Sequence, residues 1–239
     1  MPEEFVATHL SRLARKTERG NHERKAIYDI LDASIVCHVA YIADGQAFAT
    51  PTLFWRDGDV LYWHGSKHGR MIRTLSQRQR VCVTVSHLDA FNLGRSGIAS
   101  SVQYRSVMAF GTTEPITEAT EKRKQMACLI DRKFSDRSDE LRAIHDHEIA
   151  QITVIRMPIE EATAKVKADG VAERSEADYA LPAWAGVIPV RMTIGPVTPD
   201  HRLQGHSDVP DNVAPYAEGR ALEDALLEAA RLRSDINEK

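Results

Sequence analysis

The segment LYWHGSKHGRMIRTL, residues 61–75, combines residue types that can bind a phosphate monoester. A strand-like run ends here, a turn bounded by two glycines follows, and a helical pattern then begins. Lys67 and Arg70 bring positive charge, Ser66 brings a hydroxyl donor, and a helix that starts after such a turn exposes backbone amides. The pattern is neither a Walker loop nor a Rossmann fingerprint. We expect an anion-binding turn, with a solvated basic turn that binds nothing as the alternative.

A second basic residue, Arg105, lies inside the strand-like run QYRSVMAF at residues 103–110. Period-two alternation turns Arg105 to the opposite face from Tyr104 and Ser106. A charged side chain within an apolar strand is costly unless it has a partner or faces a polar ligand. Arg105 is therefore either a ligand contact or an arginine on the solvent-exposed face of a strand.

The histidines and cysteines do not have the spacing of a metal site. His64 and His68 are four residues apart, but His64 ends a strand; His145 and His147 would point the same way only on a strand. No C-x-x-C pair, G-x-S-x-G elbow or H-E-x-x-H pattern occurs, so we expect neither a bound metal nor a hydrolase. The three cysteines, Cys37, Cys82 and Cys128, are widely scattered, and Cys37 and Cys82 lie in apolar runs typical of a core.

The segments that must position these residues show mainly strand patterns. Two runs of β-branched and aromatic residues flank Asp44-Gly45, which is a strong hairpin signal. A second turn at Asp57-Gly58 leads into a third run, so we expect an antiparallel meander. The expected strands are residues 34–43, 46–56, 59–64, 81–89, 101–116 and 148–157.

Helical periodicity separates and follows these strands. The expected helices are residues 21–32, 65–77, 118–134, 137–145 and a last one in RALEDALLEAARLRSDINEK. Because sequential strands pair locally, we expect a mainly β fold with flanking helices, a six-stranded antiparallel β-barrel, rather than a parallel α/β sheet.

The distribution of strand patterns and loop-forming residues divides the chain into three parts. We expect an N-terminal extension at 1–19, the barrel at 20–165, and a C-terminal segment at 166–239 that is rich in loops and ends in a helix. The last helix has one apolar stripe, made of Leu222, Leu226, Ala229, Leu232 and Ile236. This stripe packs either on the barrel or on a second subunit.

Composition narrows the classes of function. The chain has 239 residues, of which 43% are hydrophobic, so it can bury a core without disulfides or metals. Its 31 lysines and arginines against 34 aspartates and glutamates give a net charge of −3, which argues against nucleic acid as the main partner. No apolar run is long enough to span a membrane, and the first residues lack a signal-peptide core. We expect a cytoplasmic protein without a membrane or nucleic-acid partner.

Seven segments between residues 19 and 195 follow one another in a recognisable order: ERGNHERKAIYDIL, ATPTLFW, LYWHGSKHGRMIRTL, VCVTVSHLD, QYRSVMAFG, IRMPIEEATAKVK and WAGVIP. In this order they resemble the pyridoxamine 5′-phosphate oxidase-related proteins, which are FMN-binding split β-barrels. The resemblance is greatest to the branch of flavin-nucleotide-binding proteins that includes nitroimidazole-resistance proteins.

The resemblance implies that FMN is bound in a homodimer interface, with the ATPTLFW strand beside its ring. The residues that would contact FMN are Ala49, Thr50, Thr52 and Leu53 beside the isoalloxazine, Trp63 and His64 flanking the ring or ribityl chain, Ser66, Lys67 and Arg70 at the phosphate, Arg105 and Ser106 near the ring, and Trp184 from the second subunit. Orientation and tuning of the flavin would be the task of the protein, while the redox chemistry is that of the cofactor.

The function implied first is that of an FMN-dependent oxidoreductase acting on a small organic substrate. Oxidation of pyridoxamine phosphate itself is not expected, because no basic pair suited to a second phosphate ester stands near the C-terminal end of the barrel. His64 occupies the position of a histidine singled out in the nitroimidazole branch and is the candidate catalytic residue. The alternatives are a non-enzymatic flavin carrier or sensor, and a heme-binding split barrel with His201 or His206 as ligand.

Overall fold

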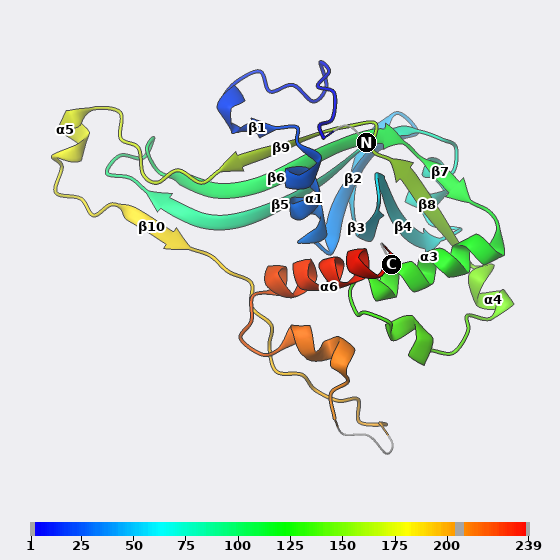
Figure 1. Cartoon of the computed structure of the whole chain (residues 1–239). Coiled ribbons are helices and arrows are strands. Elements are labelled where there is room, and N and C mark those ends of the chain that lie inside the picture. Colours follow the sequence, from blue (N-terminus) through cyan, green and yellow to red (C-terminus); the bar gives the residue numbers. More distant parts are fainter. Residues whose placement is uncertain (1–2, 204–207, 238–239) are drawn as a thin grey trace.

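One antiparallel sheet forms the body of the molecule (Figure 1), in a computed structural model that describes residues 3–203 and 208–237, with side chains as far as Arg231. Its strands lie in the order β1-β9-β6-β5-β2-β3-β4-β8-β7, and β10 pairs with β5. The strands are β1 (Gly20–Asn21), β2 (Val36–Ala43), β3 (Gln46–Asp57), β4 (Val60–Ser66), β5 (Arg80–Leu93), β6 (Ser101–Thr112), β7 (Glu114–Ile116), β8 (Ile152–Pro158), β9 (Glu161–Lys167) and β10 (Gly186–Pro189).

Helices cover the ends and one outer side of this sheet. The α-helices are α1 (Arg24–Asp32), α2 (Arg70–Leu75), α3 (Ala119–Asp131), α4 (Asp146–Ile149), α5 (Glu176–Tyr179) and α6 (Leu222–Asn237), and the 3-10 helices are η1 (Thr17–Arg19), η2 (Arg137–Glu140) and η3 (Asp211–Tyr216). Helix α3 covers the outer side of β3, β4 and β8, while α1 contacts β6 and β9 and carries α6 on its other side. No helix in these described ranges is both long and apolar enough to cross a bilayer.

The sheet curls until its two ends meet, which gives a split barrel. Strand β8 runs into β9 at the opposite end of the sheet order, and Gly111 of β6 approaches the same corner. A Cβ atom on Gly111 would lie 2.1 Å from the carbonyl oxygen of Pro158, so only glycine allows this closure. The predicted mainly β, antiparallel fold with flanking helices is confirmed.

The predicted number of six strands is wrong, because the described sheet has ten. Two of the additional strands, β1 and β10, are only two and four residues long. The predicted strand 101–116 divides into β6 and β7 at Thr113, whose buried hydroxyl donates to the carbonyl of Leu75. Strand β9 lacks the alternation of a half-exposed strand because its first four residues are buried on both faces.

The predicted hairpin turns are confirmed by their backbone. Asp44 and Gly45 have φ values of 50° and 74°, and Gly58 has a φ of 55°. Positive φ at these positions matches the right-handed twist of the paired strands, which explains Asp44-Gly45 at the first turn and Gly58 at the second. The meander from β2 to β4 is thereby fixed locally.

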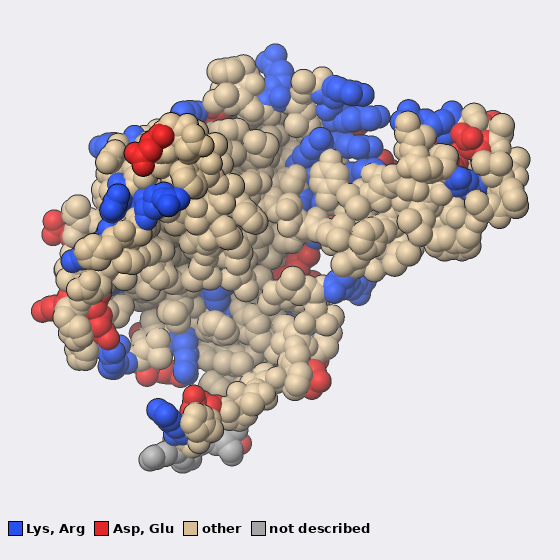
Figure 2. Space-filling view, turned by 180° about the vertical axis from the view of Figure 1, so that it is seen from behind, with Lys and Arg blue, Asp and Glu red and all other residues tan. Residues whose placement is uncertain are grey.

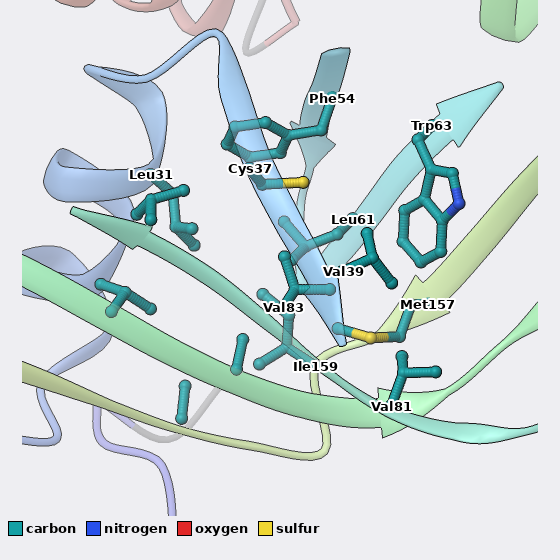
Figure 3. Close-up of a cluster of buried hydrophobic side chains, with 14 of the residues drawn as sticks. Leu31, Cys37, Val39, Phe54, Leu61, Trp63, Val81, Val83, Met157 and Ile159 are labelled. Atoms are coloured by element: carbon teal, nitrogen blue, oxygen red, sulfur yellow. The ribbon is translucent and has the colours of Figure 1, made fainter. Parts of the chain in front are cut away.

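Aliphatic and aromatic side chains fill the barrel interior (Figure 3). Leu31 of α1 closes one end, and the strands contribute buried residues that include Val39, Phe54, Trp63 and Val83. Complete burial of each such side chain contributes about 1.5–3 kcal/mol. A second cluster around Trp55 and Tyr62 lies outside the barrel under α3.

The distal halves of β5 and β6 leave the barrel and form an arm (Figure 1). We define the arm as residues 89–103, the end of this hairpin, together with residues 168–192, which include α5 and β10. A bulge between Leu88 and Ala90 marks the point where β5 passes from the barrel into the arm. The predicted loop-rich C-terminal segment is therefore partly an ordered extension of the sheet.

Helix α6 packs on its own chain, which answers the question about its apolar stripe. Ala225, Leu226 and Ala229 are buried, and the cluster around Leu226 includes Tyr216 of η3 and the partly buried Phe134. The side chains of Leu232 and Ile236 lie outside the described residues.

Candidate functional site

Strand β3 changes partners in its middle, and this change opens the split of the barrel. Residues 46–53 pair with β2 along their whole length, whereas only residues 54–57 pair with β4. The last pair between β3 and β4 joins Phe54 to Trp63, so the two strands separate beyond Leu53 and His64. Within the described residues, no strand pairs with 46–53 on the side away from β2.

The hydrogen bonds of β3 decide which backbone groups face this open edge. The Phe54 amide donates to the carbonyl of Ile35 at 3.1 Å, on the side of β2. Backbone groups alternate sides along an antiparallel strand, so even-numbered residues of β3 face β2 and odd-numbered ones face the split. The free edge therefore presents the Leu53 amide, the Pro51 carbonyl, and both backbone groups of Ala49.

The four residues predicted beside the isoalloxazine ring differ in the direction of their backbone groups. The backbone groups of Thr50 and Thr52 are directed toward β2, so only their hydroxyls remain for a ligand. The Thr50 hydroxyl donates to the Tyr41 hydroxyl at 3.3 Å. Ala49 and Leu53 are the two of the four residues whose amides face the split.

The basic turn follows directly on the end of β4. Ser66, Lys67 and Arg70 are exposed, and among the described residues neither cation forms an ion pair. Three amides of the turn are occupied: Lys67 donates to the Gln151 carbonyl at 3.0 Å, Gly69 to the Ser66 carbonyl at 2.9 Å, and His68 to Ser66 Oγ at 3.3 Å. The N-cap of α2, Gly69, has no side chain that covers the first amides of the helix, so the predicted exposure of amides at the helix start stays a prediction.

One contact joins the basic turn to the far side of the split. The Arg70 guanidinium lies over the Phe48 ring, 4.6 Å from its centroid, and Phe48 stacks on Tyr41 at 5.5 Å. Arg70 belongs to α2 and Phe48 to β3, so this cation–π contact brings the basic turn close to the free edge. Sequence analysis missed Phe48, although its position directly before the ATPTLFW segment is a signal that could have been used.

Trp63 and His64 point to opposite sides of β4, so they do not act as a pair. The Trp63 indole has no exposed surface and lies in the barrel interior, where its Nε1 has no described partner. Trp63 is therefore a core residue, and its expected contact with the ring or ribityl chain stays a prediction. Alternation along the strand separates it from His64, because neighbouring side chains take opposite faces.

His64 remains at the mouth of the split. Its side chain is half-buried, its ring lies 6.4 Å from that of Trp55, and its buried Nδ1 has no hydrogen-bond partner among the described residues. Burial lowers the pKa of His64 below the usual histidine value, because a charged imidazole would lose its hydration. His64 is therefore a neutral imidazole with an unused nitrogen.

Arg105 is not available to a ligand, because two carboxylates hold it. Its guanidinium bonds Asp89 of β5 and Glu223 of α6, each at 2.7 Å, and these bonds raise the pKa of Arg105. The expectation of a ligand contact is thus replaced by an ion-pair cluster that fastens α6 to the sheet. Ser106 lies on the other face of β6, as the alternation predicted, with its hydroxyl 3.4 Å from the Lys165 carbonyl.

Trp184 lies on the arm, just before β10. Its ring stands over Gly186, where a Cβ atom would come within 2.8 Å of the indole, and the residue is 68% exposed. No described contact joins Trp184 to the basic turn of its own chain. Its expected contribution from a second subunit stays a prediction.

A separate cavity lies away from the split, in the described part of the chain. It has a volume of about 600 Å³ and is lined by residues of η2, η3, α6 and the segment between α3 and η2, including Lys133, Glu140 and Asn212. Most of the residues predicted to contact a ligand lie instead along the unpaired edge of β3 and in the turn after β4.

Comparison with known proteins agrees with this geometry. The family model for pyridoxamine 5′-phosphate oxidases matches residues 23–166. The flavocytochrome Anf3 from Azotobacter vinelandii is 34% identical, with a TM-score of 0.82 over 89% of this chain and 98% of its own. An FAD and heme binding protein from Mycobacterium smegmatis is 30% identical, with a TM-score of 0.79 over 85% of this chain and 98% of its own.

A more distant structure shares the fold alone. It is a candidate 5-nitroimidazole antibiotic resistance protein from Bacteroides thetaiotaomicron, 24% identical, with a TM-score of 0.52 over 62% of this chain and 86% of its own. No curated protein matches the chain. The matched residues span most of the barrel and include the split, its free edge and the basic turn. The chain therefore belongs to the pyridoxamine 5′-phosphate oxidase family.

Proposed function

We propose that this protein binds FMN in the split of its barrel and works as a flavin-dependent oxidoreductase on a small organic substrate. The observation that carries the proposal is the position of an unpaired strand edge beside an unpaired basic turn. The edge offers hydrogen-bonding groups to a planar molecule, and the turn offers charge to a phosphate. FMN has both parts, joined by a flexible ribityl chain.

The turn fits the phosphate of FMN. A phosphate monoester carries a charge of about −1.5 to −2 near neutral pH. Lys67 and Arg70 would supply two positive charges, and Ser66 would supply a hydroxyl donor. Since neither cation has an ion-pair partner among the described residues, no internal salt bridge has to break when a phosphate binds.

The edge fits the pyrimidine side of the isoalloxazine, which carries an N–H group between two carbonyl oxygens. The Pro51 carbonyl would accept from that N–H group, and the Leu53 amide would donate to a neighbouring oxygen. A donor at this position would also favour the reduced, anionic form of the ring. His64 lies where β3 and β4 separate, so it is the candidate to contact the ring or the substrate.

The bound flavin would supply the electron-transfer chemistry. The chain would hold the phosphate, orient the ring along the β3 edge and keep His64 neutral. The same groups would serve a flavin carrier that does not turn over. Reduction by NADH or NADPH in a stopped-flow experiment separates these two functions.

A homodimer would complete the site. The outer face of the sheet beside the split exposes Val36, Ile42, Leu53 and Met108, which are apolar residues that a monomer would leave in water. Their exposure supports a second copy on this face, and Trp184 of that copy is the proposed additional contact to the flavin. A reducing compartment such as the cytoplasm suits three cysteines that form no disulfide.

FAD and heme are the second candidates, and the names of two relatives support them. One is named a flavocytochrome and the other an FAD and heme binding protein. FAD shares the ring and first phosphate of FMN, so the same groups would hold it. For heme, neutral His64, whose Nδ1 has no hydrogen-bond partner among the described residues, would be the candidate to hold the iron. The earlier candidates fit less well, since His201 is exposed beside Asp200 and His206 lies outside the described residues.

Absorbance of the purified protein tests the proposal. Flavin bands would support it, a Soret band would show heme, and release by heating followed by chromatography would separate FMN from FAD. In the variant K67A/R70A we expect at least about a hundredfold loss in flavin affinity, since two charge-assisted contacts each contribute about 1.5–3 kcal/mol. Arg73→Ala, on the same helix and also exposed, is the matched control and should bind normally. Unchanged binding by K67A/R70A would place the phosphate elsewhere.

A further inference from the structure

The arm has an inverted distribution of polar and apolar side chains. Asn92 is only 1% exposed, and the side chain of Glu173 has no exposed surface. By contrast, Phe91 is 43% exposed and Ile98 is 69% exposed. A segment that is complete by itself buries its apolar residues, so this inversion indicates a surface made for contact.

The arm is nevertheless an ordered structure rather than a loose loop. Asn92 donates to the carbonyls of Asp169 and Gly170 at 2.8 and 3.1 Å. The Glu173 carboxylate accepts from the Arg95 amide at 2.6 Å, which ties the hairpin tip to the returning chain. The buried polar groups thus hold the arm in shape without an apolar core, and little ordering would be needed on binding.

Both faces of the outermost strand of the arm are uncovered. Val187 and Ile188 are neighbours on β10 and point to opposite faces, yet they are 41% and 45% exposed. On β5 the bulge changes the exposed positions from even to odd numbers, so that Leu88 and Phe91 are both exposed. The apolar surface therefore continues from the barrel into the arm.

We infer that the arm is a clasp for a second copy of this chain. This inference rests on the homodimer of the proposed function. A second copy is the favoured partner because the exposed apolar surface is continuous. It runs along β5 from the face that we assign to the dimer directly into the arm. In a two-fold dimer, the arm of each subunit would then cover the partner, and the contact would be made twice.

The charges at the arm tip argue against an anionic membrane as the occupant. Figure 2 shows both signs at the end of the arm, with neutral surface between them and the barrel. Arg95 and Arg174 stand there with Glu176 and Asp178, so no basic patch is formed. Mixed charge around an apolar centre is the composition of a protein interface.

The test is sedimentation velocity of the full chain with glutamate placed in the arm. Phe91→Glu and Ile98→Glu, in two separate variants, should raise the dimer dissociation constant at least about tenfold, because each buries an unpaired charge. Leu141→Glu is the matched control, since Leu141 is 46% exposed but lies near α4, and it should leave the dimer unchanged. Circular dichroism would confirm that each variant is folded.

Three outcomes would overturn the clasp and remain distinct from failure of the proposed function. If both arm variants associate like the wild type while Met108→Glu dissociates, the dimer is held by the barrel face without the arm. A wild-type monomer that retains flavin removes both clasp and dimer but leaves the flavin site. Binding of the wild type, but not of Phe91→Glu, to vesicles of phosphatidylcholine with phosphatidylglycerol would assign the arm to a lipid surface.

Discussion

The Phe54 amide donates to the Ile35 carbonyl at 3.1 Å, and this one bond sets the direction of the backbone groups along β3. Every second amide before it is directed toward β2, and the remaining ones face the split. The pairing with β4 ends at Phe54, so the groups that face the split beyond this point have no strand to bond. A binding edge is thereby made from backbone geometry alone.

Proline scanning of β3 should separate binding from folding. Leu53→Pro removes an amide that faces the split, so we expect a folded protein with weakened flavin binding. Thr52→Pro is the matched control, because its amide is directed toward β2; its loss should reduce the free energy of unfolding by about 1–3 kcal/mol. Urea titration and flavin fluorescence measure the two quantities. Equal loss of stability in both variants would show that the Leu53 amide is paired within the fold.

Removal of Arg105 should loosen α6 without emptying the flavin site. Arg105→Ala leaves Asp89 and Glu223 facing one another, so we expect the free energy of unfolding to fall by about 1–2 kcal/mol. The control is Arg142→Ala, whose partner Glu148 is also on the surface, and whose effect on the free energy of unfolding should be smaller because solvent screens this pair. Flavin content should be normal in both variants. Loss of flavin from Arg105→Ala would instead indicate that Arg105 is a flavin-binding residue.

The same cluster predicts a dependence of stability on pH. Arg105 holds the pKa of Glu223 below its ordinary value of 4.5, so the folded protein keeps this carboxylate charged where the unfolded chain protonates it. The stabilisation is complete above pH 4.5 and is lost as the pH falls through the lower, folded pKa. Thermal unfolding of wild type and Glu223→Gln should therefore differ at pH 7 and converge in acid. A difference that grows toward acid pH would have the wrong sign for this ion pair.

Closure of the barrel depends on Gly111, where the space for a side chain admits only a hydrogen atom. Gly111→Ala would place a methyl group 2.1 Å from the Pro158 carbonyl, and we expect a loss of about 1–3 kcal/mol or more from this overpacking. Gly97→Ala is the same substitution at a site where nothing lies within 4 Å, so it should be nearly neutral. Thermal denaturation of the two variants makes the comparison. A normal melting temperature for Gly111→Ala would mean that the backbone between β8 and β9 can shift to admit a methyl group at little cost in stability.

Much of the local architecture could be predicted from the sequence, because its causes are local. The Asp-Gly turns need positive φ at Asp44, Gly45 and Gly58, and the strand pattern around them is strong. The helices at 24–32 and 119–131 fall within the predicted ranges because their apolar spacing is regular. The basic turn after β4 was likewise found from residue types alone.

What the sequence could not show depends on contacts between distant segments. Arg105 and Glu223 are separated by 118 residues, so nothing near Arg105 indicated its partner. The burial of Trp63 follows from which face of β4 turns inward, and that is decided only when the sheet closes. The exposed edge of β3 exists because β4 ends its pairing at Phe54, which depends on register and leaves no mark in composition.

Pro51 lies in the open edge of β3 and affects how easily the chain can aggregate along that edge. An uncovered strand edge is a template for another strand, and chains that expose one tend to aggregate. Proline at 51 removes the middle amide from this edge, so an approaching strand would meet an interrupted ladder. The groups left at Ala49 and Leu53 suit a small planar molecule better than a second backbone. The edge can thus stay open for a ligand while the newly made chain is kept from polymerising along it.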